Sequence, residues 1–348
     1  MLAYRHAFHA GNHADVLKHA TLVEVLHHLN AKDKAWRLVD THAGAGAYAL
    51  HADAAQKLGE YRQGIARLWQ QGSLPTLLAD YIAQVRHFNP QDELASYPGS
   101  PCLARALMRP QDQLRLYELH PTDHTLLADA FAGDKAVQVQ QADGFAGIKA
   151  QLPPPSRRGL LLMDPSYELK TDYAAVFNAT QEALTRFAEG TVMVWYPQID
   201  ARESANLPVR LKALANAQAR KGWLHARLTV AEPNDRGFGM LGSGVFVINP
   251  PHTLREQLRQ ARTAHHPSSL PRHRPSPPRL ARQYPASPRR WPRGPTCPPP
   301  RMIGPLGLPS IRRSTPRPPP SMPRAVLPLP RPPRPRSRAR EPLVPHPS

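Results

Sequence analysis

A chain of 348 residues with 41% hydrophobic residues can bury one large core, and it has no run of eighteen or more apolar residues, which excludes an ordinary membrane-spanning helix. Of the net charge of +19, the segment from residue 262 to the end carries +17, with 18 Arg and one acid, so the high charge does not make the rest a basic nucleic-acid-binding domain. Cys102 and Cys297 lie too far apart for a short-spaced metal or redox motif, and the opening residues have no apolar signal-peptide core, so we expect a cytoplasmic protein.

The first 34 residues combine a histidine-rich opening with a helix. Leu22, Leu26 and Leu29 recur at helical spacing and predict a helix over residues 15–30, with Asn12 as its N-cap. We treat residues 1–34 as an N-terminal segment distinct from the domain that follows.

Short apolar runs and helix-like stretches alternate through the body of the chain. The apolar runs predict buried strands at residues 36–40, 114–118, 137–143, 160–164 and 192–195. The helical patterns between them cover residues 100–108, 122–131, 144–152, 173–187 and 207–219. This alternation indicates an α/β fold, with a Rossmann-like, doubly wound parallel sheet over residues 35–260.

Two additions to this sheet are predicted. Helical patterns at residues 54–71 and 74–88 indicate a helical subdomain inserted at about residues 50–96, between the first and second strands. Near the end, residues 224–230 and 244–249 have the pattern of two antiparallel strands. A parallel sheet that ends in an antiparallel hairpin is typical of many methyltransferases.

Residues 261–348 differ in composition from everything before them. Of the 42 prolines, 27 lie after Gln260, and no Lys occurs there. Such a segment buries too little apolar surface to offset the entropy of ordering it, so we expect a disordered low-complexity tail. The abrupt switch points to a reading-frame change in the gene, which tryptic peptides of the tail from native protein would contradict. A genuine tail would add salt-sensitive, sequence-blind RNA affinity.

Acidic residues stand at the ends of four predicted strands: Asp40, Glu118, Asp143 and Asp164. Because the carboxyl ends of parallel strands meet at one edge of the sheet, we expect all four to line one crevice, although a single acid there is more often a helix cap. Glu118 suits the paired hydroxyls of a ribose, and Asp143 suits an adenine amine. The small residues of AspThrHisAlaGlyAlaGly (40–46) allow close approach of the backbone to a ligand.

The sequence AspProSerTyr (164–167) follows a buried strand and resembles the Asp/Asn-Pro-Pro-Tyr/Phe motif of amino-methyltransferases. An adenine amine is a poor nucleophile, but Asp164 and the Pro165 carbonyl can accept its two hydrogens and direct its lone pair at a methyl group. Asp164 can also take up the proton that leaves, and Tyr167 can stack on the flipped base. Ser166 replaces the commoner second proline, which loosens the turn. The alternative is a proline turn with a core tyrosine.

An ordered set of motifs then identifies a family. The opening TyrArgHisAlaPheHisAlaGlyAsnHisAlaAspValLeuLysHis (4–19) resembles the signature of the RlmJ family of large-subunit ribosomal RNA adenine-N6 methyltransferases. Further matches occur in the same order at residues 40–46, TyrProGlySerPro (97–101), GluLeuHisPro (118–121), AlaAspGly (142–144) and TrpTyrPro (195–197). The resemblance covers about residues 1–260.

The resemblance implies S-adenosylmethionine as cofactor and one adenine of 23S ribosomal RNA as target. The implied cofactor contacts are His19, His42, Ser100, Glu118, Asp143, Gly144 and Asp164, with Asp164 also catalytic. Tyr4, His6 and Lys18 would act on the RNA side, in an N-terminal segment that closes over cofactor and base. We expect a monomer that needs neither a metal nor a membrane.

Three alternatives remain open from the sequence. The same pocket could serve a DNA adenine methyltransferase, against which the N-terminal signature argues. A zinc protein would use histidines from one short region: His6, His9, His13, His19, His27 and His28. A non-catalytic RNA-binding relic would have lost turnover through Ser166 or the altered C-terminus.

Overall fold

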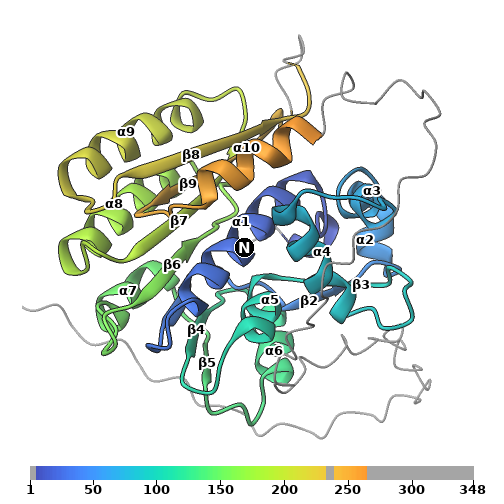
Figure 1. Ribbon diagram of the computed structural model, residues 1–348, viewed down its shortest axis with the longest axis horizontal. Coiled ribbons are helices and arrows are strands. Elements are labelled where there is room, and N and C mark those ends of the chain that lie inside the picture. Colours follow the sequence, from blue (N-terminus) through green and yellow to red (C-terminus); the bar gives the residue numbers. More distant parts are fainter. Residues whose placement is uncertain (1–4, 233–238, 265–348) are drawn as a thin grey trace, which may run out of the picture. The chain divides into compact units, whose positions relative to one another are not determined.

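The computed structural model describes residues 5–232 and 239–264. Within these ranges a seven-stranded sheet has the order β5-β4-β1-β6-β7-β9-β8 (Figure 1). Its strands are β1 (Arg37–Asp40), β4 (Gln113–Tyr117), β5 (Val137–Gln140), β6 (Gly159–Met163), β7 (Thr191–Gln198), β8 (Trp223–Thr229) and β9 (Gly242–Ile248). The first five in this order pair in parallel, whereas β9 is antiparallel to both β7 and β8. The predicted Rossmann-like sheet with a final antiparallel hairpin is therefore confirmed.

Both faces of the sheet are covered by helices, which explains why the strands read as continuous apolar runs. In β6, Leu160 and Leu162 belong to the core that includes helices α1 (His13–Asn30) and α5 (Ser100–Leu107). Leu161 and Met163 point to the other face and pack in the core of α7, α8 and α9. These last helices are α7 (Gly144–Gln151), α8 (Thr171–Arg186) and α9 (Arg202–Gln218).

Helix α1 is buried along most of its length, including several of its polar residues. Asn12 caps it as predicted, since its side chain accepts hydrogen bonds from the backbone N–H groups of Ala14 (2.9 Å) and Asp15 (3.0 Å). The first turns bury Asp15, Lys18 and His19. Charged groups withdrawn from water in this way need partners, and those partners lie at the site described below.

The inserted region is helical but more broken than the sequence pattern predicts. The single helix expected over 54–71 is wrong: it is divided into α2 (Asp53–Leu58), a 3₁₀ turn η2 (Glu60–Gln63) and α3 (Ile65–Trp69). The break occurs at Gly59, which adopts a left-handed φ of 63° that ends α2. Helix α4 (Thr76–His87) follows the second pattern, and a small antiparallel pair that was not predicted, β2 (Ala47–Ala49) and β3 (Ser96–Pro98), joins the two ends of the insertion.

Three further elements complete the described part of the chain: η1 (His6–Phe8), α6 (Pro121–Ala130) and α10 (Leu254–Ala264). Helix α10 was not predicted, and it continues past the expected domain end at residue 260. Leu254 and Ala261 pack in the core that contains α1. Among the described helices, none is long and apolar enough to cross a membrane. The predicted tail from residue 265 onward lies outside the described residues.

The strand register decides which loops meet at the carboxyl edge. Asp40 pairs with Leu116 of β4 on one side and with Leu162 of β6 on the other. Two residues beyond each of these positions come His42, Glu118 and Asp164, so the three loops leave the sheet side by side. The fold therefore brings together residues that are far apart in the sequence.

Candidate active site

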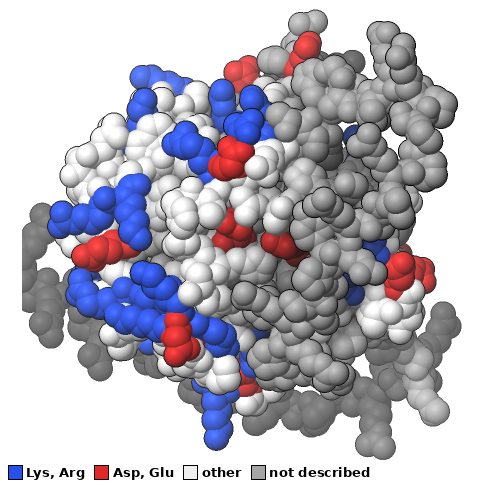
Figure 2. Space-filling model, in the orientation of Figure 1, with Lys and Arg blue, Asp and Glu red and all other residues white. Residues whose placement is uncertain are grey.

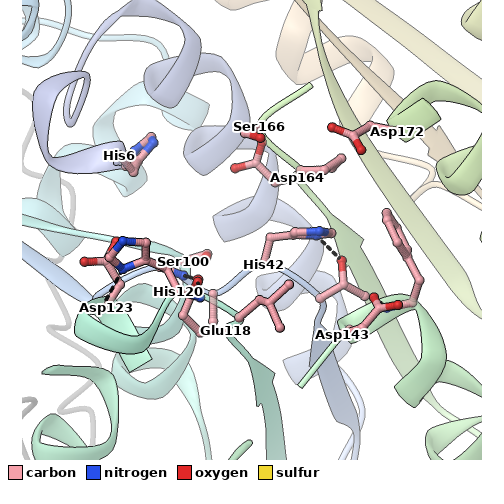
Figure 3. Close-up of a pocket in the computed structure, with 18 of the residues that line it drawn as sticks. His6, His42, Ser100, Glu118, His120, Asp123, Asp143, Asp164, Ser166 and Asp172 are labelled. Carbon is pink, nitrogen blue, oxygen red and sulfur yellow. Dashed lines mark hydrogen bonds between the residues drawn. The ribbon is translucent and has the colours of Figure 1, made fainter. Parts of the chain in front are cut away.

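A cavity of about 360 Å³ opens at the carboxyl edge of the sheet. This volume is in the usual range for a small-molecule site. Most of the predicted site residues line it: His6, Lys18, His19, His42, Ser100, Glu118, Asp143, Gly144, Asp164 and Pro165. These residues come from the N-terminal segment, from the start of α5 and from the loops after β1, β4, β5 and β6, and Figure 3 labels His6, His42, Ser100, Glu118, Asp143 and Asp164 among them.

Asp40 departs from the expectation that four acids line one crevice. Its side chain is fully buried, and it is not among the described residues that line the cavity. Oδ2 accepts a hydrogen bond from Ser100 Oγ (2.6 Å), and Oδ1 accepts one from the backbone N–H of His42 (3.3 Å). Burial raises the pKa of Asp40 to about 7. The prediction is thus wrong for Asp40, because α5 covers the end of β1.

Tyr167 also lies away from the cavity lining in this structure. Its ring packs in the core against Tyr173, with ring centroids 4.6 Å apart, and its hydroxyl donates a hydrogen bond to the Trp195 carbonyl (2.7 Å). The residue adopts a φ of 55°, which is unusual for a side chain of this size. Tyr167 is thus a core tyrosine, as the alternative expects, whereas Asp164, Pro165 and Ser166 of the same turn line the cavity. Tyr4 lies outside the described residues.

Glu118 is held by backbone groups on both sides. One oxygen accepts from the N–H of Gly44 (2.8 Å) and the other from the N–H of His120 (2.7 Å), and burial raises the pKa of the carboxyl. Gly44 has a φ of 63°, a conformation that favours glycine. The carboxylate is therefore fixed at the cavity wall with lone pairs to spare, as a ribose diol requires.

The turn from β5 into α7 forms an adjoining wall. Asp143 caps α7 by accepting from the N–H of Phe145 (2.9 Å), and Phe145 packs edge-on against His42, with ring centroids 4.9 Å apart. A Cβ atom on Gly144 would lie 2.2 Å from the carbonyl oxygen of Thr41, so only glycine allows the two loops to approach this closely. Burial lowers the pKa of His42 to about 4, so its ring is neutral near pH 7.

This donor set fits S-adenosylmethionine. Glu118 can hold the ribose hydroxyls, Asp143 can accept from the adenine amine, and His42 and Phe145 offer apolar ring surface. Further carboxylates that the sequence analysis missed also line the cavity: Asp123, Glu168 and Asp172. An acidic cavity of this kind suits the positive charge of a sulfonium.

His19 belongs to a buried chain of hydrogen bonds that crosses into the insertion. Its Nδ1 lies 2.7 Å from the Tyr97 hydroxyl, which in turn lies 2.9 Å from the Tyr81 hydroxyl. Burial lowers the pKa of His19 to about 3, so the imidazole is neutral in the folded protein. Helix α1, the segment before α5 and helix α4 are thereby tied together behind the cavity.

The catalytic carboxylate predicted from the sequence, Asp164, lies in the cavity beside Pro165 and Ser166. Its side chain is 16% exposed and is paired with the ammonium of Lys18, which also contacts Asp15 at 2.9 Å. Burial raises the pKa of Asp164, and Lys18 acts in the opposite direction. Lys18 was placed on the RNA side by resemblance, and here its buried ammonium meets the carboxylate 146 residues further along the chain.

Two contacts of the N-terminal segment were also missed by the sequence analysis. Arg5 donates a 2.8 Å hydrogen bond to Asp123 at the start of α6, and His6 Nε2 lies 2.8 Å from Asp15. Both contacts hold η1 beside the cavity. The contact between Arg5 and Asp123 could not be predicted from sequence spacing, because the two residues are 118 positions apart.

A doubly wound sheet with a final antiparallel hairpin, an acid after β4 at the cavity wall and an AspProSerTyr turn after β6, together with the family match below, defines a methyltransferase that uses S-adenosylmethionine. The family described as "Ribosomal RNA large subunit methyltransferase D, RlmJ" matches residues 33–266. The chain belongs to this RlmJ family.

Individual relatives support the same assignment. The chain is 48% identical over 258 residues to ribosomal RNA large subunit methyltransferase J of Escherichia coli K12, covering 74% of this chain and 90% of that protein. It is 45% identical over 261 residues to the protein of the same name from Haemophilus influenzae, covering 75% and 91%. The crystal structure of protein LPL1258 from Legionella pneumophila has 35% identity and a TM-score of 0.67, over 74% of this chain and 92% of that one.

The zinc alternative finds no support in the described ranges. No three His, Cys, Asp or Glu side chains are grouped there so as to hold a metal ion. Instead, His19 lies beside Tyr97, His6 beside Asp15 and His9 beside Glu60 (3.1 Å).

Proposed function

We propose that this chain methylates the exocyclic N6 amine of one adenine in 23S ribosomal RNA. The observation that carries the proposal is the position of Asp164 and Pro165 together in the cavity wall, next to the residues that fit the cofactor. The names of the relatives, large-subunit ribosomal RNA methyltransferases, support RNA over DNA as the polymer.

The residues at the carboxyl edge of the sheet bind the cofactor, orient the adenine amine and take up its proton. Glu118, Asp143, His42, Ser100, His19 and Gly144 hold S-adenosylmethionine, which supplies an electrophilic methyl group when bound. Asp164 and the Pro165 carbonyl accept the two amine hydrogens and orient the N6 lone pair. The N6 lone pair would take the methyl group from the bound cofactor, and one N–H proton of the amine would pass to the Asp164 carboxylate.

The surface and the domain organisation are consistent with an RNA substrate. Lys and Arg side chains gather around α7, α8 and α9 on the face shown in Figure 2, although the body of the chain carries a net charge of only +2. We infer a cytoplasmic monomer in which residues 1–34 close over the site, residues 35–260 with α10 form the catalytic domain, and the insertion spans about 50–96. Tyr4, His6 and Lys18 are assigned to the RNA side of the site, and Tyr167 to support of the AspProSerTyr turn.

Transfer of labelled methyl groups to an unmodified 23S fragment tests the proposal. We expect incorporation into N6-methyladenine with the wild-type chain and a loss of at least about a hundredfold with Asp164→Ala. A DNA fragment of the same sequence should remain unlabelled.

Equal incorporation by both proteins would remove Asp164 from the mechanism. Preferential labelling of DNA would favour the rival polymer. A wild-type chain that binds S-adenosylhomocysteine in a calorimeter but labels neither polymer would be a relic without turnover.

A further inference from the structure

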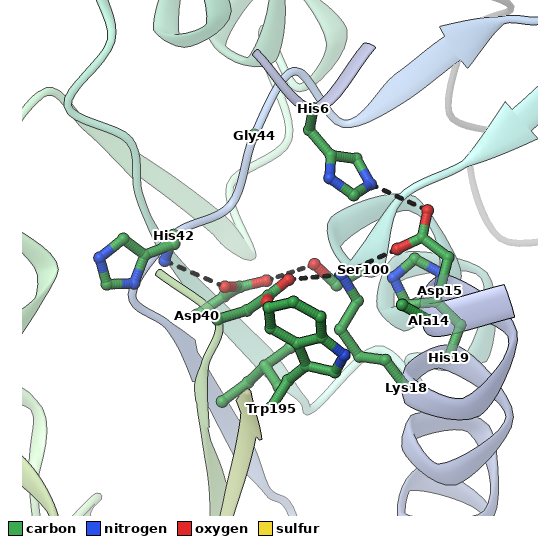
Figure 4. Close-up of polar contacts among 12 residues, drawn as sticks. His6, Ala14, Asp15, Lys18, His19, Asp40, His42, Gly44, Ser100 and Trp195 are labelled. Atoms are coloured by element: carbon green, nitrogen blue, oxygen red, sulfur yellow. Dashed lines mark hydrogen bonds and ion pairs between the residues drawn. The ribbon is translucent and has the colours of Figure 1, made fainter. Parts of the chain in front are cut away.

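Asp15 is a buried carboxylate with three partners at the edge of the site, and neither the motifs nor the chemistry above assigns it a role. Its side chain is 1% exposed. Oδ2 lies 2.8 Å from His6 Nε2, and Oδ1 lies 2.9 Å from the Lys18 ammonium (Figure 4). Oδ2 also accepts a hydrogen bond from the N–H of Gly11 (2.8 Å). Because an ionised carboxylate only accepts hydrogen bonds, Nε2 of His6 carries the hydrogen of that contact.

The contacts of Lys18 join Asp15 to the catalytic carboxylate. Its ammonium, with a side chain only 5% exposed, contacts Oδ1 of Asp15 and Oδ2 of Asp164. One positive charge is therefore divided between two carboxylates, of which Asp15 is buried and Asp164 is partly exposed to the cavity. If Asp15 were neutral, the ammonium would pair with Asp164 alone and would compete with the adenine amine for that carboxylate.

We propose that Asp15 is a positioning residue for methyl transfer: it shares the Lys18 ammonium with Asp164 and holds His6 at the cavity. This inference rests on the proposed function. The proton released by the amine goes to Asp164. The strength of the ion pair between Lys18 and Asp164 therefore determines how readily the Asp164 carboxylate accepts that proton. Asp15 touches neither the methyl group nor the base and acts through its neighbours.

The charged and titratable groups around Asp164 give the proposal a definite sign. They come from η1, α1, β1 and the turn after β6: His6, Asp15, Lys18, Asp40 and Tyr167. Around Asp15 lie His6, His13, Lys18, His19, Tyr48, Tyr81, Tyr97 and Asp164. Lys18 lowers the pKa of Asp164, whereas Asp15 raises it. Removal of the Asp15 charge should therefore lower the pKa of Asp164, and removal of the Lys18 charge should raise it.

The test compares full-length Asp15→Asn and Lys18→Met with wild type at saturating cofactor and RNA. For Asp15→Asn we expect kcat at neutral pH to fall about tenfold, and the acidic limb of its pH profile to move to lower pH by about half a unit. For Lys18→Met the same limb should move to higher pH. The affinity of Asp15→Asn for S-adenosylhomocysteine, measured by calorimetry, should remain within about threefold of wild type.

Asp112→Asn is the matched control, because Asp112 is equally buried and accepts hydrogen bonds from Trp36 and Arg109 far from the cavity. It should lower the unfolding temperature without moving the acidic limb. The proposal would be overturned if the acidic limb of the pH profile of Asp15→Asn did not move, or if it moved in the same direction as that of Lys18→Met.

Should Asp15→Asn fail to fold, Asp15→Glu replaces it. That variant retains the negative charge, so the acidic limb of its pH profile should stay at the wild-type position while kcat is lower. An acidic limb moved to lower pH in Asp15→Glu would contradict the inference. A wild-type chain that transfers no methyl group to RNA would instead refute the proposed function, which separates the two failures.

Discussion

The hydroxyl of Ser100 donates a 2.6 Å hydrogen bond to the carboxylate of Asp40, so the first residue of α5 closes over the last residue of β1. Ser100 lines the cavity while Asp40 is sealed behind it. The serine thus has two neighbours: the cavity on one side and a buried acid on the other. Because its only hydroxyl hydrogen is directed at Asp40, Ser100 offers a ligand its oxygen lone pairs.

The buried Asp40 makes stability depend on pH. Its pKa is about 7 in the folded protein, against an ordinary value of 3.8, so the folded state holds a proton that the unfolded chain releases between these values. Its contribution to stability is complete below about pH 4 and is lost as the pH rises to about 7. Relative to Asp40→Asn, the wild-type free energy of unfolding should therefore decrease over this range, by on the order of 4 kcal/mol at most.

Urea unfolding of wild type and Asp40→Asn at half-unit steps from pH 4.5 to 8 measures this difference. Asn keeps an oxygen that can accept from Ser100, so the fold should survive the change. The exposed Asp33→Asn serves as the control and should give a curve parallel to wild type. Parallel curves for Asp40→Asn as well would show that the carboxyl is ionised throughout.

Gly144 is predicted to tolerate no side chain. An added Cβ would overlap the Thr41 carbonyl at 2.2 Å, and that backbone cannot move without separating the loops after β1 and β5. Gly144→Ala should destabilise the protein by about 1–3 kcal/mol and weaken S-adenosylhomocysteine binding at least about tenfold. Calorimetry and thermal unfolding measure the two effects.

Gly72→Ala is the control, because nothing lies within 4 Å of its added Cβ. It should leave both quantities near wild type. Wild-type affinity in Gly144→Ala would show that the two loops do not need their close contact to hold the cofactor.

Tyr167 is expected to act through its hydroxyl on the protein rather than on RNA. Tyr167→Phe removes the hydrogen bond to the Trp195 carbonyl, so the free energy of unfolding should fall by about 1–2 kcal/mol. The KM for RNA should be unchanged, because the ring lies in the core. Tyr61→Phe is the control: it loses a solvent-exposed hydrogen bond from Gln56, so the free energy of unfolding should fall much less. A raised KM for RNA in Tyr167→Phe would place the hydroxyl on the substrate.

The sequence alone predicted most of the sheet, because the burial of a parallel strand is written in consecutive residues. The apolar run 160–164 predicted β6, and the acids that follow β4, β5 and β6 predicted the edge at which the cavity opens. Helix boundaries were less accurate where glycine interrupts an otherwise regular pattern, as at Gly59.

Side-chain partners were decided by the tertiary structure. Spacing could place Asp40 at a strand end, but whether α5 covers it depends on how that helix crosses the sheet. Likewise, Lys18 meets Asp164 because α1 packs over the carboxyl edge, and Asp15 shares its charge because the same helix turn is buried. Strand and helix patterns are local properties of the chain, whereas the pairing of buried charges depends on groups brought together only when the separate elements pack.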